Sequence, residues 1–229
     1  MFSGPCANLL LFFIADIKWI TPNIVTTSSL LLCFIAAFLI SKGTMTCLIV
    51  GSVLVQLVFV LDCLDGQLAR YRKQSSNFGA WYDRVTDRVK DFLIYFSIAY
   101  GHYAIYQDWK IWPLGMTSLF FIYLLDYYVN QDVKLETKDQ KTSEYQNTST
   151  SAHQNINTTS SILNSFFALG KNVYNLCPIL RFKIGEQYLL ISIFLLFNQT
   201  RLLFLIVISL GFLYSIYWPF AQYYGKKPG

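Results

Sequence analysis

The chain has 229 residues, of which 54% are hydrophobic and only 14% are charged, and its mean hydropathy is +0.40. A soluble globular domain usually carries more charge and fewer apolar residues, so this composition indicates a membrane protein. The formal net charge of +5 comes without any aromatic-basic module for reading bases, which argues against a nucleic-acid-binding protein.

Three charge-free segments are long enough to cross a bilayer, since a spanning helix needs about 20 apolar residues. They cover residues 20–41, 43–61 and 202–225. Three shorter charge-free segments cover residues 92–107, 111–125 and 187–200. The shorter ones either span with the help of polar turns at their ends or lie as interfacial or buried segments. We predict that they span, which gives an all-α integral membrane protein with six transmembrane helices.

The stretch before the first of these helices contains the apolar run Leu9–Ala15, followed by Asp16, Lys18 and Trp19. No basic residue precedes this run and no convincing cleavage site follows it, which argues against a signal peptide. The pattern instead predicts a short N-terminal helix that lies in the inner membrane interface.

The composition changes after the fourth predicted helix, which we expect to end near Asn130. Residues 132–161 are Lys, Glu, Asp, Gln, Asn, Ser and Thr with almost no hydrophobic side chains. Such a stretch buries too little apolar area to order itself, so we predict a flexible cytoplasmic insert without a chemical role. Apart from this insert, residues 1–229 are predicted to form a single membrane domain.

The distribution of Lys and Arg predicts the orientation in the membrane. If six helices cross and both termini are cytoplasmic, only Lys42, Lys110 and Arg201 of the 18 basic residues lie outside. The opposite orientation would violate the positive-inside rule. We therefore predict a multi-pass protein whose basic loops face the cytoplasm and contact anionic lipid.

Two pairs of aspartates at helical spacing are the most informative feature of the chain. Asp62 and Asp65 are three residues apart near the end of the second predicted helix, and Asp83 and Asp87 are four apart near the start of the third. Each spacing places a pair on one helix face, and the short connecting loop makes the two helices antiparallel. The four carboxylates are therefore predicted to converge near the cytoplasmic membrane surface.

Four acids at this depth need compensating positive charge, because one carboxylate in the membrane costs about 2.5–3.5 kcal/mol even on lenient insertion scales. Arg70, Arg84 and Arg88 could supply part of it. A site made only of oxygen ligands suits hard cations such as Mg2+ or Mn2+ better than zinc. Two such ions would clamp a diphosphate and neutralise developing charge.

Small residues beside the acids leave room for a ligand. Gly66 and Gly79 lack a side chain where a ligand or a second backbone must come close, and Ala69 is similarly small. Arg70 offers a guanidinium fork for phosphate oxygens. One acid pair is usually a solvated helix face, but two pairs with two glycines and an arginine at membrane depth indicate a functional site.

The combined pattern D-x2-D-G-x2-A-R-x8-G-x3-D-x3-D resembles the signature of the CDP-alcohol phosphatidyltransferase family, with every fixed position filled. Thr21-Pro22-Asn23 and Thr26 also resemble the start of that family's first transmembrane helix. The resemblance implies six transmembrane helices preceded by an interfacial helix, as the hydropathy pattern also predicts. It further implies a homodimer.

The resemblance also implies roles for the motif residues. Asp62, Asp65, Asp83 and Asp87 would bind two divalent cations, Mg2+ or Mn2+, and Asp87 would also be the catalytic general base. The residues implied to line the CDP site are Asp62, Gly66, Ala69, Arg70, Gly79 and Asp83. The implied reaction is attack by an alcohol oxygen on the β-phosphorus of a CDP-alcohol, commonly CDP-diacylglycerol, with release of CMP, in phospholipid biosynthesis.

The acceptor is defined less sharply by the sequence. Basic residues that could collect on the cytoplasmic rim are Arg72, Lys73, Lys134, Arg181 and Lys183. A phosphorylated acceptor such as inositol phosphate or glycerol phosphate suits that patch, although the same charges fit ordinary positive-inside topology. Asp83-Arg84, Asp87-Arg88 and the position of Arg181 resemble the branch that uses inositol phosphate, without separating it from users of glycerol phosphate, serine or ethanolamine.

Other classes of protein also place acids in a membrane. An intramembrane prenyltransferase holds Mg2+-diphosphate on aspartate-rich motifs, but usually in the form DxxxD, and the D-G-x2-A-R continuation argues against it. An ion-coupled transporter would carry buried acids too, yet transporters often show repeats and broken midplane helices, and this chain shows no repeat. An inactive family member is a third alternative, which the complete set of acids disfavours.

Overall fold

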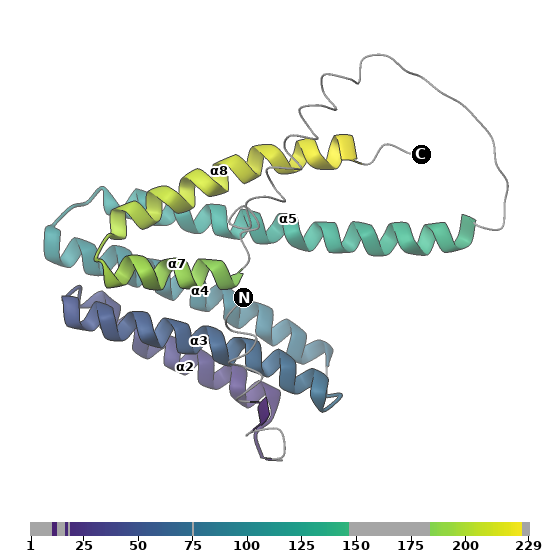
Figure 1. Ribbon diagram of the computed structural model, residues 1–229, viewed down its shortest axis with the longest axis horizontal. Helices are drawn as coiled ribbons and strands as arrows, with labels where there is room; N and C mark the ends of the chain where they lie inside the picture. Colours follow the sequence, from purple (N-terminus) through teal and green to yellow (C-terminus); the bar gives the residue numbers. More distant parts are fainter. Residues whose placement is uncertain (1–10, 13–16, 18, 75, 147–183, 226–229) are drawn as a thin grey trace. The chain divides into compact units, whose positions relative to one another are not determined.

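The computed structural model describes residues 11–12, 17, 19–74, 76–146 and 184–225, and the account below is confined to them. These residues contain six helices and no strand. The helices are α2 (Pro22–Ser41), α3 (Met45–Tyr71), α4 (Asn77–Tyr106), α5 (Ile111–Gln146), α7 (Ile184–Leu196) and α8 (Thr200–Gly225), as Figure 1 shows. The predicted all-α class is confirmed, whereas the predicted N-terminal interfacial helix lies largely outside the described residues.

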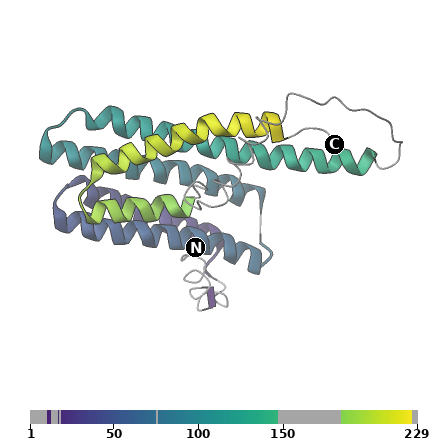
Figure 2. The same ribbon diagram turned by 45° about the horizontal axis from the view of Figure 1, so that its top comes forward.

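The first two long helices form an antiparallel pair. Thr21 caps α2, because its hydroxyl accepts a hydrogen bond from the Ile24 N–H at 3.4 Å, and Pro22 fits in the first helical turn without losing a bond. The turn into α3 passes through Gly43, whose φ of +66° is in the left-handed region that glycine adopts readily. Both views in Figures 1 and 2 show α2 and α3 side by side as a result.

Glycines allow α4 to pack directly on the end of α2. A Cβ on Gly101 would lie 2.4 Å from the carbonyl oxygen of Ile40, and a Cβ on Gly43 would lie 2.4 Å from the carbonyl oxygen of Gly101. No side chain fits at either distance, so this contact requires glycine at both positions. It fixes where α4 crosses α2, and therefore where the aspartates at the other end of α4 are placed.

Polar contacts attach α7 to α3. The Gln56 amide donates hydrogen bonds to the Tyr188 carbonyl oxygen at 2.9 Å and to Ser192 Oγ at 2.8 Å. Next to this bond the rings of Phe59 and Tyr188 stack with their centroids 5.4 Å apart. Hydrogen bonds to backbone and hydroxyl satisfy these polar groups between two apolar helices, where water is scarce.

The chain divides into two compact units, which are described separately. The first comprises Met1–Leu119 and Lys183–Ile208, and the second comprises Phe120–Phe182 and Ser209–Gly229. All the motif aspartates belong to the first unit. In the second unit Gly211 lies against the ring of Phe121, and Tyr214 stacks on Trp218 with the ring centroids 5.1 Å apart.

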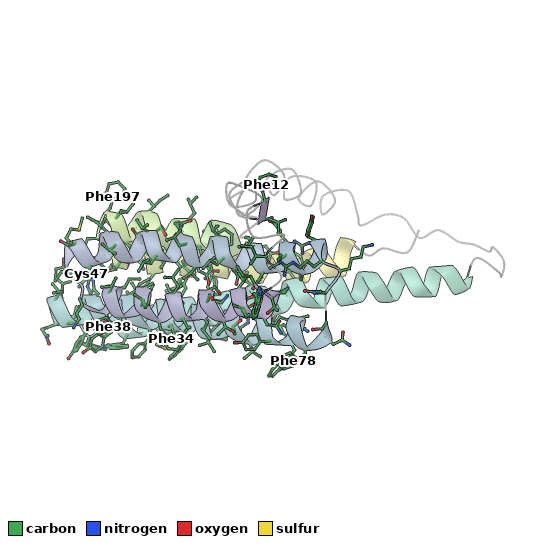
Figure 3. All side chains as sticks on the ribbon, turned by 90° about the horizontal axis from the view of Figure 1, so that it is seen from below. Phe12, Phe34, Phe38, Cys47, Phe78 and Phe197 are labelled. Carbon is green, nitrogen blue, oxygen red and sulfur yellow. The ribbon has the colours of Figure 1, made fainter. Side chains whose placement is uncertain are left out.

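Two helices, α2 and α3, are long and apolar enough to cross a membrane, and α7 and α8 contain shorter apolar stretches. Large side chains project outward from them: in Figure 3 Phe34 and Phe38 point away from the helices, and they are 48% and 61% exposed. Apolar surface on this scale is typical of a membrane-facing protein rather than a water-facing one.

The structure corrects one predicted boundary. The fourth predicted helix was expected to end near Asn130, which is wrong, because α5 continues to Gln146. The added residues include Lys, Glu, Gln and Leu, whose straight side chains lose little freedom in a helix and favour it without any apolar burial. The first part of the predicted insert is therefore helical, and residues 147–161 lie outside the described residues.

Candidate active site

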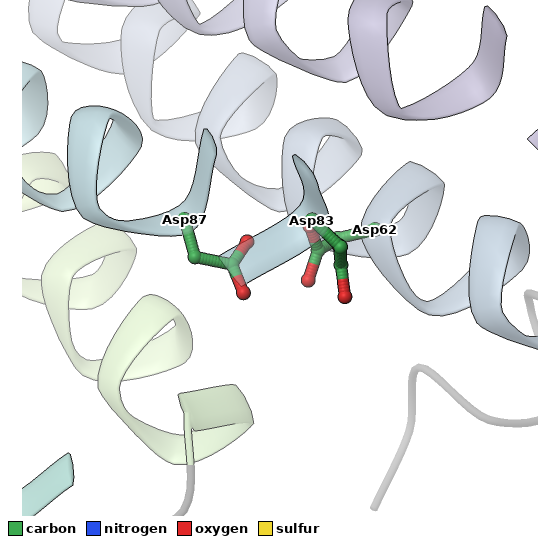
Figure 4. A group of neighbouring side chains, drawn as sticks. All are labelled: Asp62, Asp83 and Asp87. Carbon is green, nitrogen blue, oxygen red and sulfur yellow. The ribbon is translucent and has the colours of Figure 1, made fainter. Parts of the chain in front are cut away.

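Three of the four predicted aspartates meet at one point in the first unit. One carboxylate oxygen from each of Asp62, Asp83 and Asp87 lies within 4.8 Å of the other two. Asp62 comes from α3 and the other two come from α4, and Figure 4 shows the three side chains converging. All three are partly exposed, so an ion or a substrate can reach them.

The start of α4 is set by a local cap that positions two of these acids. Ser76 Oγ accepts a hydrogen bond from the Gly79 N–H at 2.9 Å, which satisfies one of the free donors of the first turn. Because the helix begins there, Gly79, Asp83 and Asp87 follow one another along a single face at intervals of four residues. The spacing read from the sequence therefore has the structural consequence that was predicted for it.

The fourth aspartate, Asp65, faces α2. Its side chain is only 4% exposed, and its Oδ2 accepts a hydrogen bond from the Thr26 hydroxyl at 2.5 Å. Asp65 is not one of the three residues whose oxygens converge, but together with Asp83 it lines the adjoining pocket. The acids therefore form a group of three with the fourth on the pocket wall beside it.

That pocket has a volume of about 190 Å3 and lies between the start of α2, the end of α3 and the start of α4. Of the six residues predicted to line a CDP site, five line it: Gly66, Ala69, Arg70, Gly79 and Asp83. The sixth, Asp62, lies in the neighbouring acidic group. The predicted nucleotide-binding residues are thus brought together around one open space.

The two motif glycines differ in how tightly they are enclosed. A Cβ on Gly79 would lie 3.1 Å from Ser76 Oγ and 3.3 Å from Asn23 Oδ1, which is closer than ordinary contact. A Cβ on Gly66 would first meet Arg70 Nη1, at 3.5 Å, an ordinary contact distance. A side chain at Gly79 would therefore make Ser76 or Asn23 shift by a few tenths of an ångström, whereas Gly66 leaves space that a ligand can use.

A buried lysine that the sequence reasoning missed completes the acidic group. Lys90 has an exposed fraction of 0%, and its ammonium forms ion pairs with Asp62 and, at 2.9 Å, with Asp87. Ser29 Oγ on α2 lies 3.4 Å from the same nitrogen and accepts from it. The available signal was the spacing of Asp83, Asp87 and Lys90 at i, i+4 and i+7, which places the lysine on the acidic face.

Two of the three arginines that were expected to compensate these acids have other partners, and the third, Arg70, lines the adjoining pocket. Arg84 Nε donates to the Ala80 carbonyl oxygen at 2.9 Å, one turn back along its own helix. Arg88 Nη1 lies 3.6 Å from the carboxylate of Asp91. Among the described residues, the cation in contact with Asp62 and Asp87 is Lys90.

The predicted acceptor-binding residues are only partly described. Arg72 donates hydrogen bonds to the carbonyl oxygens of Ile20 at 2.5 Å and Ile17 at 2.7 Å, which attaches the stretch before α2 to the end of α3. The backbone of Lys134 belongs to α5, but its side chain lies outside the described residues, as do Arg181 and Lys183. An acceptor role for these four residues stays a prediction.

The donor set fits a divalent cation. Three carboxylate oxygens from two helices converge on one volume, and oxygen ligands of this kind suit Mg2+ and Mn2+. The neighbouring pocket offers a guanidinium, that of Arg70, and glycine backbone, which suit a phosphate group. The arrangement can therefore bind an ion and a phosphorylated ligand next to each other.

Residues 19–216 match the CDP-alcohol phosphatidyltransferase family, and the chain belongs to that family. It is accordingly a transferase, and the predicted family is confirmed. Membership favours phosphotransfer from a CDP-alcohol over the prenyltransferase and transporter alternatives.

The relatives of this chain include proteins named bifunctional IPC transferase and DIPP synthase. The protein from Aquifex aeolicus is 31% identical over 107 residues, which is 47% of this chain and 23% of the relative. The protein from Rubrobacter xylanophilus is 38% identical over 82 residues, which is 36% of this chain and 18% of the relative. The matched region thus spans less than a quarter of the length of either relative.

Proposed function

We propose that this protein transfers a phosphatidyl group from CDP-diacylglycerol to the hydroxyl of a small polar acceptor and releases CMP, as a step of phospholipid biosynthesis. One observation carries the proposal: the carboxylates of Asp62, Asp83 and Asp87 converge beside a pocket lined by Arg70 and two glycines. A nucleotide diphosphate needs cations beside its phosphates, and carboxylates that can hold cations lie next to this pocket.

We assign the binding of two divalent cations, Mg2+ or Mn2+, to Asp62, Asp65, Asp83 and Asp87. When bound, such ions neutralise the diphosphate and the departing CMP. The convergence of three of these carboxylates supports the assignment, and the fourth lies on the wall of the pocket where the diphosphate would enter.

The chain's own residues have distinct tasks in the proposed reaction. Arg70 binds phosphate oxygens of the donor, and Gly66 and Gly79 admit the nucleotide to the pocket. The acceptor oxygen forms a bond to the β-phosphorus while the bond from that phosphorus to the CMP oxygen breaks. Asp87 takes the proton from the acceptor hydroxyl, as a general base within hydrogen-bond reach would.

We further propose that α2, α3, α4, α5, α7 and α8 all cross the membrane, with the site and both termini on the cytoplasmic side. The excess of Lys and Arg in the loops on that side supports this orientation. The diacylglycerol tails would enter from the lipid, and the acceptor would enter from the cytosol. The chain would act as one membrane domain and as a homodimer, and residues 132–161 would have no chemical role.

For the acceptor we propose inositol phosphate, with glycerol phosphate as the second candidate. The paired sequences Asp83-Arg84 and Asp87-Arg88 support a phosphorylated acceptor, because they resemble the branch of the family that uses inositol phosphate. Arg72, Lys134, Arg181 and Lys183 would add positive charge at the cytoplasmic rim.

The test is release of CMP from CDP-diacylglycerol by the purified full chain with Mg2+ or Mn2+. Inositol phosphate, glycerol phosphate, serine and ethanolamine are supplied one at a time. We expect CMP release that depends on one acceptor and falls at least about 100-fold in Asp87→Asn, since a positioned general base contributes about 10²–10⁴-fold.

The matched control is Asp108→Asn, the same substitution just beyond the other end of α4, where Asp108 pairs with Arg201 at 2.5 Å. It should keep the activity of the unsubstituted protein. If folded protein released no CMP with any acceptor and either metal, the proposed donor would be wrong, and other CDP-alcohols would be tested next.

A further inference from the structure

Lys90 is the most deeply buried charge among the described residues, with an exposed fraction of 0%, and it projects from α4 into the acidic group. Its ammonium has oxygen partners on three helices: Ser29 on α2, Asp62 on α3 and Asp87 on α4 itself. An ammonium has three donors, so each of these partners can accept one hydrogen.

Such a lysine is stable only because it is paired. Burial of an unpaired ammonium is costly, and removal of one partner from a buried ion pair leaves an uncompensated charge. The acids need a partner as well, because carboxylate oxygens of Asp62, Asp83 and Asp87 lie within 4.8 Å of one another and repel in the absence of a cation. Lys90 thus supplies one positive charge in direct contact with Asp62 and Asp87.

The lysine contacts two of the carboxylates that a divalent cation would use. Oδ1 of Asp62 and Oδ1 of Asp87 both contact Nζ of Lys90. An ion held between these two carboxylates would share them with the ammonium and would be repelled by it at short range. Lysine and metal therefore compete for part of one ligand set.

We propose that Lys90 is a built-in counter-cation of the metal site: it holds Asp62 and Asp87 in position when no ion is bound and weakens the binding of divalent cations. The inference rests on the metal role proposed above for these carboxylates. Lys90 is a positioning residue in this account, since it acts through the aspartates. A protein with this lysine is stable without metal, and it needs a higher metal concentration to fill the site than the carboxylates alone would need.

The experiment compares Mn2+ binding by the purified full chain, by Lys90→Met and by Lys110→Met, using calorimetry without nucleotide or lipid donor. Methionine keeps much of the length and the apolar stem of lysine and removes the charge together with its hydrogen-bond donors. Lys110→Met is the matched control, because Lys110 is exposed and lies beyond the other end of α4.

We expect Lys90→Met to bind Mn2+ at least about tenfold more tightly, because a unit charge a few ångströms from the ion is removed and two ligand oxygens are freed. The melting temperature of the metal-free variant should fall, and Mn2+ should raise it by more than it raises that of the unsubstituted protein. Lys110→Met should match the unsubstituted protein in both measurements.

If metal-free Lys90→Met does not fold, Lys90→Gln purified in Mn2+ replaces it, and the Mn2+ affinity is measured by competition with a chelator. Unchanged or weaker Mn2+ binding in these variants would overturn the inference. A loss of CDP-diacylglycerol binding at unchanged Mn2+ affinity would overturn it as well, since it would make Lys90 a phosphate ligand.

The outcome is independent of turnover. If Lys90→Met binds Mn2+ more tightly while the unsubstituted protein releases no CMP, the proposed function is refuted and this inference is kept. Acceptor-dependent CMP release with identical Mn2+ affinity in both proteins would refute only the role of Lys90. Absence of Mn2+ binding in every variant would refute the metal assignment and this inference together.

Discussion

The hydrogen bond between Thr26 and Asp65 leads to a sharp prediction, because both side chains are only 4% exposed and their oxygens are 2.5 Å apart. A buried hydrogen bond to a charged group contributes about 1.5–3 kcal/mol. Since 1.36 kcal/mol corresponds to a factor of ten in an equilibrium constant, loss of this bond would change an equilibrium that depends on it by about 10- to 150-fold. Thr26→Val removes the hydroxyl and keeps the branched shape of the side chain.

We expect Thr26→Val to lower kcat/KM for CMP release by about 10- to 100-fold, the range found when a partner of a metal-binding carboxylate is removed. Thr26→Ser keeps the hydroxyl and should retain most of the activity. Thr117→Val makes the same substitution at an exposed position of α5 and should have no effect. If Thr26→Val kept both its kcat/KM and its Mn2+ affinity, Asp65 would not depend on Thr26, and the positioning argument would be refuted.

Two glycine substitutions should separate folding from ligand binding. Gly101→Ala places a Cβ 2.4 Å from the Ile40 carbonyl oxygen, so α2 and α4 must move apart. We expect the free energy of unfolding to fall by about 1–3 kcal/mol or more, which is measured as a lower melting temperature in detergent. Gly66→Ala places its Cβ 3.5 Å from Arg70, which costs little in folding, but the methyl group enters the pocket. This variant should melt like the unsubstituted protein while its KM for the CDP-alcohol rises; an unchanged KM would argue that the donor binds elsewhere.

The convergence of the acids could be predicted because it follows from fixed helix geometry. Residues four apart share a helix face in any α-helix, so Asp83 and Asp87 had to point the same way. The short connection then required α3 and α4 to be antiparallel, which brought Asp62 to them. The pocket residues were implied by the family resemblance, and helix geometry agrees with it, since Gly66, Ala69 and Arg70 follow Asp62 on the same helix within about 2.2 turns.

The spacing places Lys90 on the acidic face, but its burial between three helices could not be deduced in the same way. It depends on which face of α4 meets both α2 and α3, and that choice is set by tight contacts such as the one between Gly101 and Ile40. The contact of Thr26 with Asp65, 39 residues apart, is tertiary in the same sense. Periodicity indicates which side chains share a face, but it does not say which neighbouring helix that face will touch.

The predicted lengths of the helices depended on hydropathy, which follows apolar burial and not helix propensity. α5 shows the difference, because it continues through polar residues to Gln146. Membrane crossing, in contrast, does depend on hydropathy, and α2 and α3 have the length and the apolar content that it requires. Charges near the start of α4 interrupt its apolar run, so its crossing, and the total of six, stays a prediction.

The pairing of Asp62 with Lys90 has a consequence for how the chain enters a membrane. As α3 emerges from the ribosome it carries two aspartates near its predicted cytoplasmic end, where a buried carboxylate without a cationic partner is costly. The lysine that compensates Asp62 follows 28 residues later, on the next helix. We therefore expect the end of α3 that carries Asp62 to settle in the membrane only when α4 arrives, so that these ends of the two helices are placed together with their opposite charges already matched.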